Sequence, residues 1–168
     1  MSTPVRSVLA LGSNLGEREG ILEQAVADLS AHPLVRLVRS SPIVATKSVG
    51  GPADSPDYLN MVIEVETGLE PLALLAHCQD IEQRHDRVRV VRWGPRTLDV
   101  DVITYGDTTS EDPVLTLPHP RAAGRAFVLQ PWAWMDPHAT LGGAPVAGLA
   151  AVAADLAGLR RYEQDPRP

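Results

Sequence analysis

The sequence predicts an α+β fold, an antiparallel sheet with helices packed on one of its faces, and two observations indicate it. Several segments have the length and apolar pattern of strands, whereas two longer segments repeat apolar residues at the spacing of an amphipathic helix. The strands are expected at 5–11, 34–46, 58–67 and 98–103, and the helices at 17–31 and 71–86. This order, β-α-β-β-α-β, is that of ferredoxin-like folds.

The first strand, Val5–Leu11, leads into the string Gly12-Ser13-Asn14-Leu15-Gly16, which is typical of a tight turn. The helix that follows carries Glu17 and Glu19 in its first turn, where acidic side chains interact favourably with the helix dipole. The turn could hold a phosphate, but it lacks the Lys-Ser/Thr ending of a P-loop. We therefore expect a structural turn from which Asn14 can point into a site.

The second strand region, 34–46, is broken by Pro42, which predicts a bend or an edge position. The next eleven residues, 47–57, contain two glycines and two prolines. A connection of this length in a compact domain is usually a functional loop.

The strand Tyr58–Thr67 alternates apolar and polar residues, which predicts one buried face. Tyr58 and Asn60 open its polar face. An aromatic ring and an amide placed there could stack on a flat heterocycle and hydrogen-bond its edge, although both are also ordinary surface residues.

Pro71 is well placed to begin the second helix, because proline is favoured in the first helical turn. This helix carries Cys78, the only cysteine, so no internal disulfide is possible and a buried, inert thiol is expected. Near the C-terminus, an Ala-rich helix over Pro145–Leu159 is predicted to pack as an extension. The chain is expected to form one domain over 1–168, with frayed ends at about 1–4 and 163–168.

Chemistry is most concentrated between Arg84 and Ile103. Residues 84–96 include five arginines and one acid, in a chain whose net charge is −6. Asp99 and Asp101 follow in an apolar strand, and strand alternation places both on one face with about 6–7 Å between their backbone positions. Mg²⁺ binds one or two carboxylates together with water and phosphate oxygens, and arginine binds phosphate in a bidentate manner. The segment therefore predicts a metal–polyphosphate site, the competing interpretation being a solvated charged face.

Composition narrows the class of protein. The acidic balance disfavours a general nucleic-acid or membrane-surface binder, which carries a basic footprint. The sequence has no run of about 18 apolar residues and no apolar region of a signal peptide, so the cytoplasm is expected.

Five strings, in order, closely resemble the 6-hydroxymethyl-7,8-dihydropterin pyrophosphokinase family of folate biosynthesis. They are Gly12–Gly16, Pro56–Asn60, the Arg-Trp-Gly-Pro-Arg-Thr-Leu-Asp-Val-Asp string of Arg92–Asp101, Leu117–Arg121 and Arg125–Leu129. The resemblance extends from about Val8 to Pro137. It implies an ATP- and Mg²⁺-dependent transfer of a pyrophosphoryl group to the hydroxymethyl oxygen of the pterin, with release of AMP.

The resemblance also implies roles for individual residues. Asp99 and Asp101 would hold two Mg²⁺ ions, and Arg92 and Arg96 would act with them in catalysis. The residues that would contact ATP are Gln79, Glu82, Arg89, Arg92, Trp93, Arg96, Val102, Thr116, His119 and Arg125. Those that would contact the pterin are Asn14, Thr46, Val49, Tyr58, Asn60, Trp93, Asp99 and Phe127. The partners are then ATP and the reduced hydroxymethylpterin, with no nucleic acid or membrane, and the chain is expected to be a monomer.

Two other functions would also use these features. A metal-dependent nuclease could employ Asp99 and Asp101, but no third and fourth acidic ligand stands at a recognisable spacing. A ferredoxin-like RNA-binding module needs aromatic residues among basic ones on its exposed strands, and only 4% of this chain is aromatic.

Overall fold

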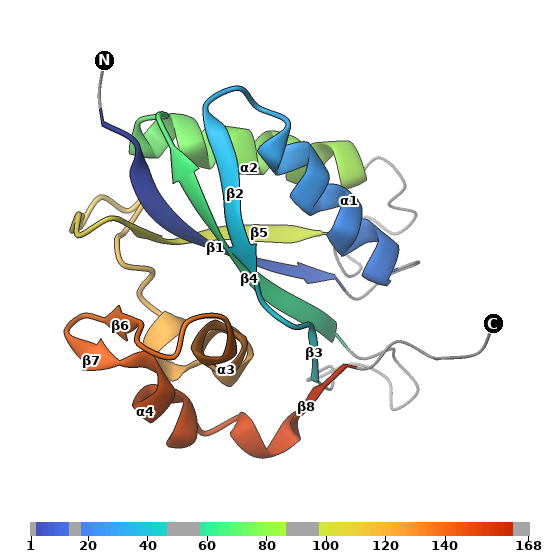
Figure 1. The fold of residues 1–168 in the computed structure, drawn as a ribbon, viewed down its shortest axis with the longest axis vertical. Coiled ribbons are helices and arrows are strands. Elements are labelled where there is room, and N and C mark those ends of the chain that lie inside the picture. The colour runs from blue at the N-terminus through green and yellow to red at the C-terminus, as the bar shows by residue number, and fades with distance from the viewer. Residues whose placement is uncertain (1–2, 14–17, 47–57, 87–97, 163–168) are drawn as a thin grey trace.

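The computed structural model describes residues 3–13, 18–46, 58–86 and 98–162, and Figure 1 shows them as ribbon. The first part of the chain contains β1 (Val5–Ser13), α1 (Arg18–Ser30), β2 (Val35–Ser40), β3 (Val44–Thr46), β4 (Tyr58–Thr67), α2 (Pro71–Asp86) and β5 (Asp99–Tyr105). The second part contains η1 (Ala122–Gly124), α3 (Ala126–Met135), β6 (Thr140–Leu141), β7 (Ala144–Pro145), α4 (Val146–Ala151), η2 (Leu156–Gly158) and β8 (Leu159–Arg161). None of the helices in the described residues combines the length and apolar character that a membrane span requires.

Within the described residues, six strands form one antiparallel sheet in the order β5-β1-β4-β3-β8, with β2 also paired to β4, and β6 and β7 form a separate hairpin. The predicted α+β, ferredoxin-like order is confirmed, and the bend expected at Pro42 separates β2 from β3. At this bend Ser41 remains tied to β4, because its Oγ accepts a hydrogen bond from the backbone N–H of Val62 at 2.9 Å. The chain therefore stays paired with β4 before the bend, through β2, and after it, through β3.

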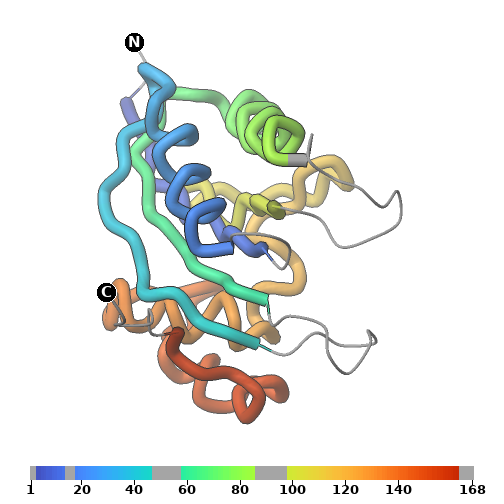
Figure 2. Tube along the Cα trace, turned by 90° about the vertical axis from the view of Figure 1, so that its right-hand side faces the viewer, coloured from blue at the N-terminus to red at the C-terminus, as the bar shows by residue number. Residues whose placement is uncertain are grey.

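One face of the sheet is covered by α1 and α2, as expected (Figure 2). Side chains that alternate along the central strands, such as Leu9 and Ile63, are fully buried against Leu22 of α1 and Leu74 of α2. Cys78 of α2 belongs to the same core, where burial raises the pKa of its thiol to about 12. The expectation of a buried, inert thiol agrees with this position.

The opposite face is covered by α3, with α4 packed on α3, which corrects the expectation of helices on one face only (Figure 1). Val8, Val62 and Ile103 point to this side and form a second core with Leu129 and Trp132 of α3. The strand Tyr58–Thr67 is therefore buried on both faces over most of its length, and not on one. The physical reason is the apolar surface of α3, which has to be covered and finds its partner in the second face of the sheet.

The C-terminal extension also differs from the helix predicted over Pro145–Leu159. Helix α4 ends at Ala151, and the chain continues through η2 into β8, which pairs with β3. Alanine has the highest intrinsic helix propensity, but propensity contributes only tenths of a kcal/mol per residue, and pairing with an open sheet edge offers the backbone of this segment hydrogen bonds with β3. Tertiary context thus overrides local propensity in this segment.

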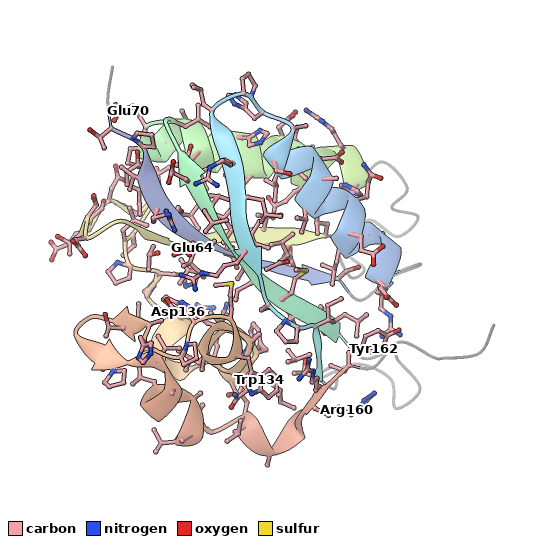
Figure 3. The ribbon with its side chains drawn as sticks, viewed as in Figure 1. Glu64, Glu70, Trp134, Asp136, Arg160 and Tyr162 are labelled. Atoms are coloured by element: carbon pink, nitrogen blue, oxygen red, sulfur yellow. The ribbon has the colours of Figure 1, made fainter. Side chains whose placement is uncertain are left out.

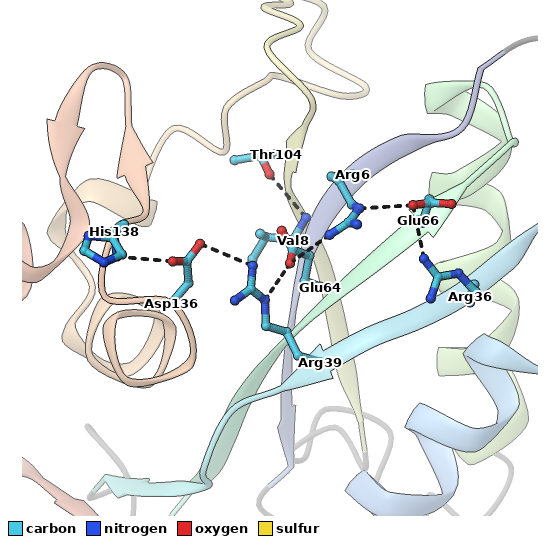
Figure 4. Close-up of polar contacts among 9 residues, drawn as sticks. All are labelled: Arg6, Val8, Arg36, Arg39, Glu64, Glu66, Thr104, Asp136 and His138. Carbon is cyan, nitrogen blue, oxygen red and sulfur yellow. Dashed lines mark hydrogen bonds and ion pairs between the residues drawn. The ribbon is translucent and has the colours of Figure 1, made fainter.

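At the far end of the second face, charged side chains link the sheet to the end of α3 (Figure 4). Arg39 of β2 lies between Glu64 of β4, at 2.7 Å, and Asp136, which follows α3, at 3.6 Å. Arg6 extends the group by contacting both Glu64 and Glu66. The hydrogen bond to Glu64 raises the pKa of the Arg39 guanidinium. These contacts fix the C-terminal end of α3 against the sheet.

Candidate active site

A cavity of about 530 Å³ opens on the second face of the sheet, at the end opposite the charged group. Strands β1, β4 and β5 form its floor, β3 and the start of α3 form its sides, and the segment around η2 closes one edge. Its lining residues are Ala10, Leu11, Gly12, Thr46, Tyr58, Asn60, Asp99, Asp101, Arg125, Phe127, Asp155 and Gly158.

Strand pairing brings the polar residues of the floor together. Gly12 of β1 lies opposite Asn60 of β4 on one side and opposite Asp99 of β5 on the other. A Cβ atom at position 12 would lie 2.6 Å from Oδ1 of Asn60. Glycine at this position therefore keeps the floor open between the amide and the carboxylate.

Asp99 and Asp101 both face the cavity, as the alternation of the strand predicts. Val100 and Val102, between and after them, are buried on the opposite side against α1 and α2. Asp101 lies opposite Ala10, so both acids face small residues of β1 that leave room in front of them. No group of three or more His, Cys, Asp or Glu side chains that could hold a metal occurs within the described residues. Two carboxylates nevertheless fit Mg²⁺, which completes its shell with water and phosphate oxygens.

Thr46, Tyr58 and Asn60 form the other end of the cavity. Asn60 is 8% exposed, and its Nδ2 lies 3.5 Å from Oγ1 of Thr46 on the neighbouring strand β3. Burial raises the pKa of the Tyr58 hydroxyl above its ordinary value, and the charge of Asp99 raises it further. An aromatic ring, an amide and a hydroxyl thus converge here, close to the first carboxylate of β5.

The start of α3 supplies Arg125 and Phe127. The guanidinium carbon of Arg125 lies 5.4 Å from the centre of the Phe127 ring, a cation–π contact. The ring lies on the second face of the sheet, as Asn60 and Tyr58 do, and packs at the edge of the second core. One turn of helix therefore adds a cation and a flat apolar surface to the cavity.

His119 precedes α3 and is oriented by two hydrogen bonds. Its backbone N–H donates to the carbonyl of Ile103 in β5, and its Nδ1 accepts from the backbone N–H of Arg121 at 3.2 Å. Burial lowers the pKa of His119 below its ordinary value; Asp101 opposes this shift, while Arg125 and Arg121 add to it. The side chain is therefore neutral at pH 7, and because Nδ1 accepts, Nε2 carries the proton and can donate to an anion.

Comparison with known proteins agrees with this arrangement. The model of the 7,8-dihydro-6-hydroxymethylpterin-pyrophosphokinase family matches residues 8–137. The chain belongs to this family. It is 46% identical to the 2-amino-4-hydroxy-6-hydroxymethyldihydropteridine pyrophosphokinase of Bacillus subtilis over 125 residues, 74% of each chain. It is 42% identical to the Pseudomonas aeruginosa enzyme of the same name over 132 residues, 79% of this chain and 81% of that one.

Solved structures support the fold. The crystal structure of wild-type Plasmodium falciparum HPPK-DHPS with pterin and p-hydroxybenzoate superposes with a TM-score of 0.71 at 13% identity, covering 96% of this chain. The structure of the same protein with pteroate gives a TM-score of 0.69 at 14% identity. This chain spans just under half the length of those proteins, 47% and 43%. Family membership sets aside the nuclease and the RNA-binding module as interpretations.

Of the site residues expected for this family, the cavity gathers seven in its lining. They are Thr46, Tyr58, Asn60, Asp99, Asp101, Arg125 and Phe127. Six others, Asn14, Val49, Arg89, Arg92, Trp93 and Arg96, lie outside the described residues.

The remaining five expected residues do not line the cavity. Glu82 of α2 accepts the backbone N–H of Val100 at 2.9 Å, so it steadies β5 directly between the two aspartates. Val102 points into the first core, and Gln79 is exposed on α2. Thr116 donates its hydroxyl to the carbonyl of Asp112 at 3.0 Å. His119, described above, is not a lining residue, but the charges of two lining residues, Asp101 and Arg125, shift its pKa.

The lining also includes residues that sequence reasoning did not assign to the site. Ala10 and Gly12 belong to the strand floor, and their small size between two polar strands is the signal that could have indicated them. Asp155 and Gly158 come from the C-terminal extension, beyond the residues that match the family. No motif marks these two, because their place depends on where the chain crosses the sheet edge.

Proposed function

We propose that this cavity is where the chain carries out the reaction of its family. The chain is a pyrophosphokinase of folate biosynthesis: it transfers the pyrophosphoryl group of ATP to the hydroxyl of 6-hydroxymethyl-7,8-dihydropterin. One observation supports this assignment. A single cavity has an aromatic ring and an amide, Tyr58 and Asn60, at one end and two carboxylates, Asp99 and Asp101, at the other. A flat heterocycle needs the first, and a metal-bound polyphosphate needs the second.

The order of the groups along the cavity supports two subsites. Asp99 acts electrostatically on Tyr58, whereas Asp101 acts on His119. The polar floor thus runs from Tyr58 past Asp99 and Asp101 to His119. The pterin belongs at the Tyr58 end and the phosphates at the His119 end, so the reacting hydroxymethyl group lies near Asp99.

The pterin subsite uses Thr46, Tyr58, Asn60 and Phe127. The rings of Tyr58 and Phe127 offer apolar faces to the heterocycle, and offset stacking of such rings contributes about 0.5–1.5 kcal/mol beyond buried area. The nearly buried amide of Asn60, whose Nδ2 lies 3.5 Å from Oγ1 of Thr46, offers hydrogen bonds to the edge of the ring system. Asn14 and Val49 complete this subsite in the proposal.

The phosphate subsite uses the two aspartates and the cations around them. Asp99 and Asp101 would hold Mg²⁺, two ions in the proposal, and when bound this metal neutralises charge on the triphosphate and orients it. In the proposal, the Arg125 guanidinium and the Nε2–H of His119 donate to phosphate oxygens, and the lowered pKa of His119 leaves its ring neutral with this N–H in place. The nucleotide contacts are completed in the proposal by Arg89, Arg92, Trp93 and Arg96. The resemblance also assigns Gln79, Glu82, Val102 and Thr116 to the nucleotide, but these four do not line the cavity, so the proposal gives them no contact with the phosphates.

The reaction itself is an in-line displacement at the β-phosphorus. The hydroxymethyl oxygen forms a bond to that phosphorus, the bond between it and the α-phosphate oxygen breaks, and AMP leaves. The hydroxyl proton is lost in this step, and Asp99 is the one candidate we offer to accept it, acting on the metal-bound hydroxyl. The surrounding residues hold the two substrates in one geometry, which is the main contribution a protein can make to phosphoryl transfer.

We further propose that the chain, as one domain over 1–168, acts as a cytoplasmic monomer on small-molecule substrates. Its net charge of −6 supports the expectation that it binds neither nucleic acid nor a membrane surface.

A nucleotide assay tests the proposed reaction. The protein is mixed with ATP, Mg²⁺ and the reduced hydroxymethylpterin, and AMP is separated from ADP. We expect AMP to form in equal amount with the pterin diphosphate and only when the pterin is present. Formation of ADP would instead identify a kinase that transfers a single phosphoryl group.

A further inference from the structure

The C-terminal segment 152–162, which we call the strap, reaches the cavity at two points. It begins after α4, lines the cavity with Asp155 and Gly158, and then forms β8 beside β3. In this pairing Leu159 lies opposite Thr46, and the backbone N–H of Tyr162 donates to the carbonyl of Ile43 at 2.8 Å. Figure 3 shows Arg160 and Tyr162 where the strap passes the sheet edge. The strap lies beyond residues 8–137, which match the family.

Asp155 contacts the first turn of α3 directly. Its Oδ1 accepts the backbone N–H of Ala126, the first residue of the helix, at 2.9 Å. The residue that precedes the helix, Arg125, makes no capping hydrogen bond with its own side chain. The first N–H groups of a helix lack partners within the helix, and a carboxylate at this end is favoured by the helix dipole. A residue 29 positions away in sequence thus caps α3.

The capped turn is the one that carries the cavity residues Arg125 and Phe127. Arg125 stands immediately before the capped N–H and Phe127 immediately after it, and both line the cavity beside Asp155 itself. Backbone rotation at Ala126 would therefore move both side chains. Because the cation–π contact joins them, they would shift together relative to Asn60 and Asp99.

We propose that Asp155 is a positioning residue for the pyrophosphokinase reaction. Through Ala126 it sets the orientation of Phe127 towards the pterin and of Arg125 towards the phosphates, so that the strap completes the substrate site. This inference rests on the function proposed above for the cavity.

The chain offers a matched control at the other end of the same helix. Asp136 follows α3, and its carboxylate also accepts a backbone N–H, that of His138 at 3.2 Å. It also pairs with Arg39, but it does not line the cavity. Loss of Asp136 removes contacts that hold α3, without touching the turn that carries Arg125 and Phe127.

The experiment compares Asp155→Ala, Asp155→Asn and Asp136→Ala in the full chain. Steady-state KM for the pterin and for ATP is measured, and amide hydrogen exchange of Ala126 is followed in the ligand-free protein. We expect Asp155→Ala to raise the pterin KM about five- to tenfold, the effect of losing one capping interaction, and to speed exchange at Ala126. Asp155→Asn keeps an oxygen acceptor and should stay within about threefold of wild type. Asp136→Ala should leave the pterin KM within about twofold.

Two outcomes would overturn the inference alone. One is wild-type pterin KM in Asp155→Ala, and the other is an equal rise in Asp136→Ala, since that would mean general loosening of α3. A wild-type protein that makes no AMP from ATP and the pterin would overturn the proposed function, and this inference with it.

Discussion

Gly12 keeps the cavity floor open because it has no side chain. It stands between Asn60 and Asp99 in the sheet, and a Cβ atom there would come within 2.6 Å of Oδ1 of Asn60. The neighbouring atom belongs to a side chain that is 8% exposed, so it has little room to give way. Substitution at this glycine therefore acts on substrate recognition first.

We expect Gly12→Ala to raise the pterin KM about ten- to a hundredfold, because overpacking of this kind costs about 1–3 kcal/mol. The matched control is Gly148→Ala in α4, where an added Cβ meets no atom within 4 Å. That change should leave the pterin KM unaltered and raise the free energy of unfolding by about 0.5–1 kcal/mol. Equal KM values in the two variants would contradict the role given to Gly12.

His119 gives the protein a pH dependence with a defined sign. Burial lowers its folded-state pKa below the 6.5 of an exposed histidine, so the unfolded chain takes up a proton first as the pH falls. As the pH falls from 6.5 to the lower folded-state pKa, the free energy of unfolding should therefore decrease. Above pH 6.5, His119 should contribute no further change. We expect His119→Gln to reduce this slope, as measured by urea unfolding at several pH values. Parallel pH profiles for wild type and variant would disprove the assignment.

At the residue scale, the sequence predicts the polar floor of the cavity well and its small or remote members poorly. Asp99 and Asp101 follow from strand alternation, whereas Tyr58 and Asn60, which could be ordinary surface residues by pattern alone, are assigned to the site through the resemblance to the family. Gly12 carries its function through the absence of a side chain. Asp155 could not be predicted, because it reaches the site only through the tertiary course of the C-terminal segment, which no local sequence pattern indicates.

At the scale of elements, α2 shows how one helix holds the sheet from the side opposite the cavity. Leu74 is fully buried in the first core, whereas Leu72, two residues earlier, is 55% exposed. Glu82 of the same helix accepts the N–H of Val100 between the two aspartates. Packing of α2 thus stabilises the strand that carries the acids without contributing to the cavity lining.

We expect Leu74→Ala to lower the free energy of unfolding by about 2–5 kcal/mol, the cost of a cavity in a well-packed core. Leu72→Ala is the control from the same helix and should change it by less than about 0.5 kcal/mol. Chemical denaturation of both variants measures the difference. Similar losses for the two leucines would mean that α2 is not packed as described.

Element boundaries follow from the sequence where the apolar pattern is strong. The predicted α1 and α2 agree with the structure to within one residue, since their apolar stripes are regular and Pro71 marks a start. The helix predicted over 145–159 fails because alanine-rich sequence shows no stripe, and because pairing of β8 with β3 supplies hydrogen bonds that only the folded sheet can offer.

At the scale of the whole molecule, the second face of the sheet combines three functions along its length. Charged contacts around Arg39 and Glu64 hold one end of α3, the apolar core around Val62 holds its middle, and the cavity lies at its start. The sequence contains the signal for this layer in the nearly uniform apolar run 126–135 and in Val62 on an otherwise polar face. Helix α3 is thus at once a layer of the core and a wall of the site.

The central claim is that Asp99 and Asp101 form the metal and phosphate end of the cavity, and turnover by Asp101→Ala tests it most directly. Asp107→Ala is the matched control, an exposed acid just past the end of the same strand. We predict that Asp101→Ala unfolds at the wild-type temperature, still binds the pterin, and loses at least about a hundredfold in AMP formation, while Asp107→Ala keeps the wild-type rate. A wild-type rate of AMP formation in Asp101→Ala would contradict the account.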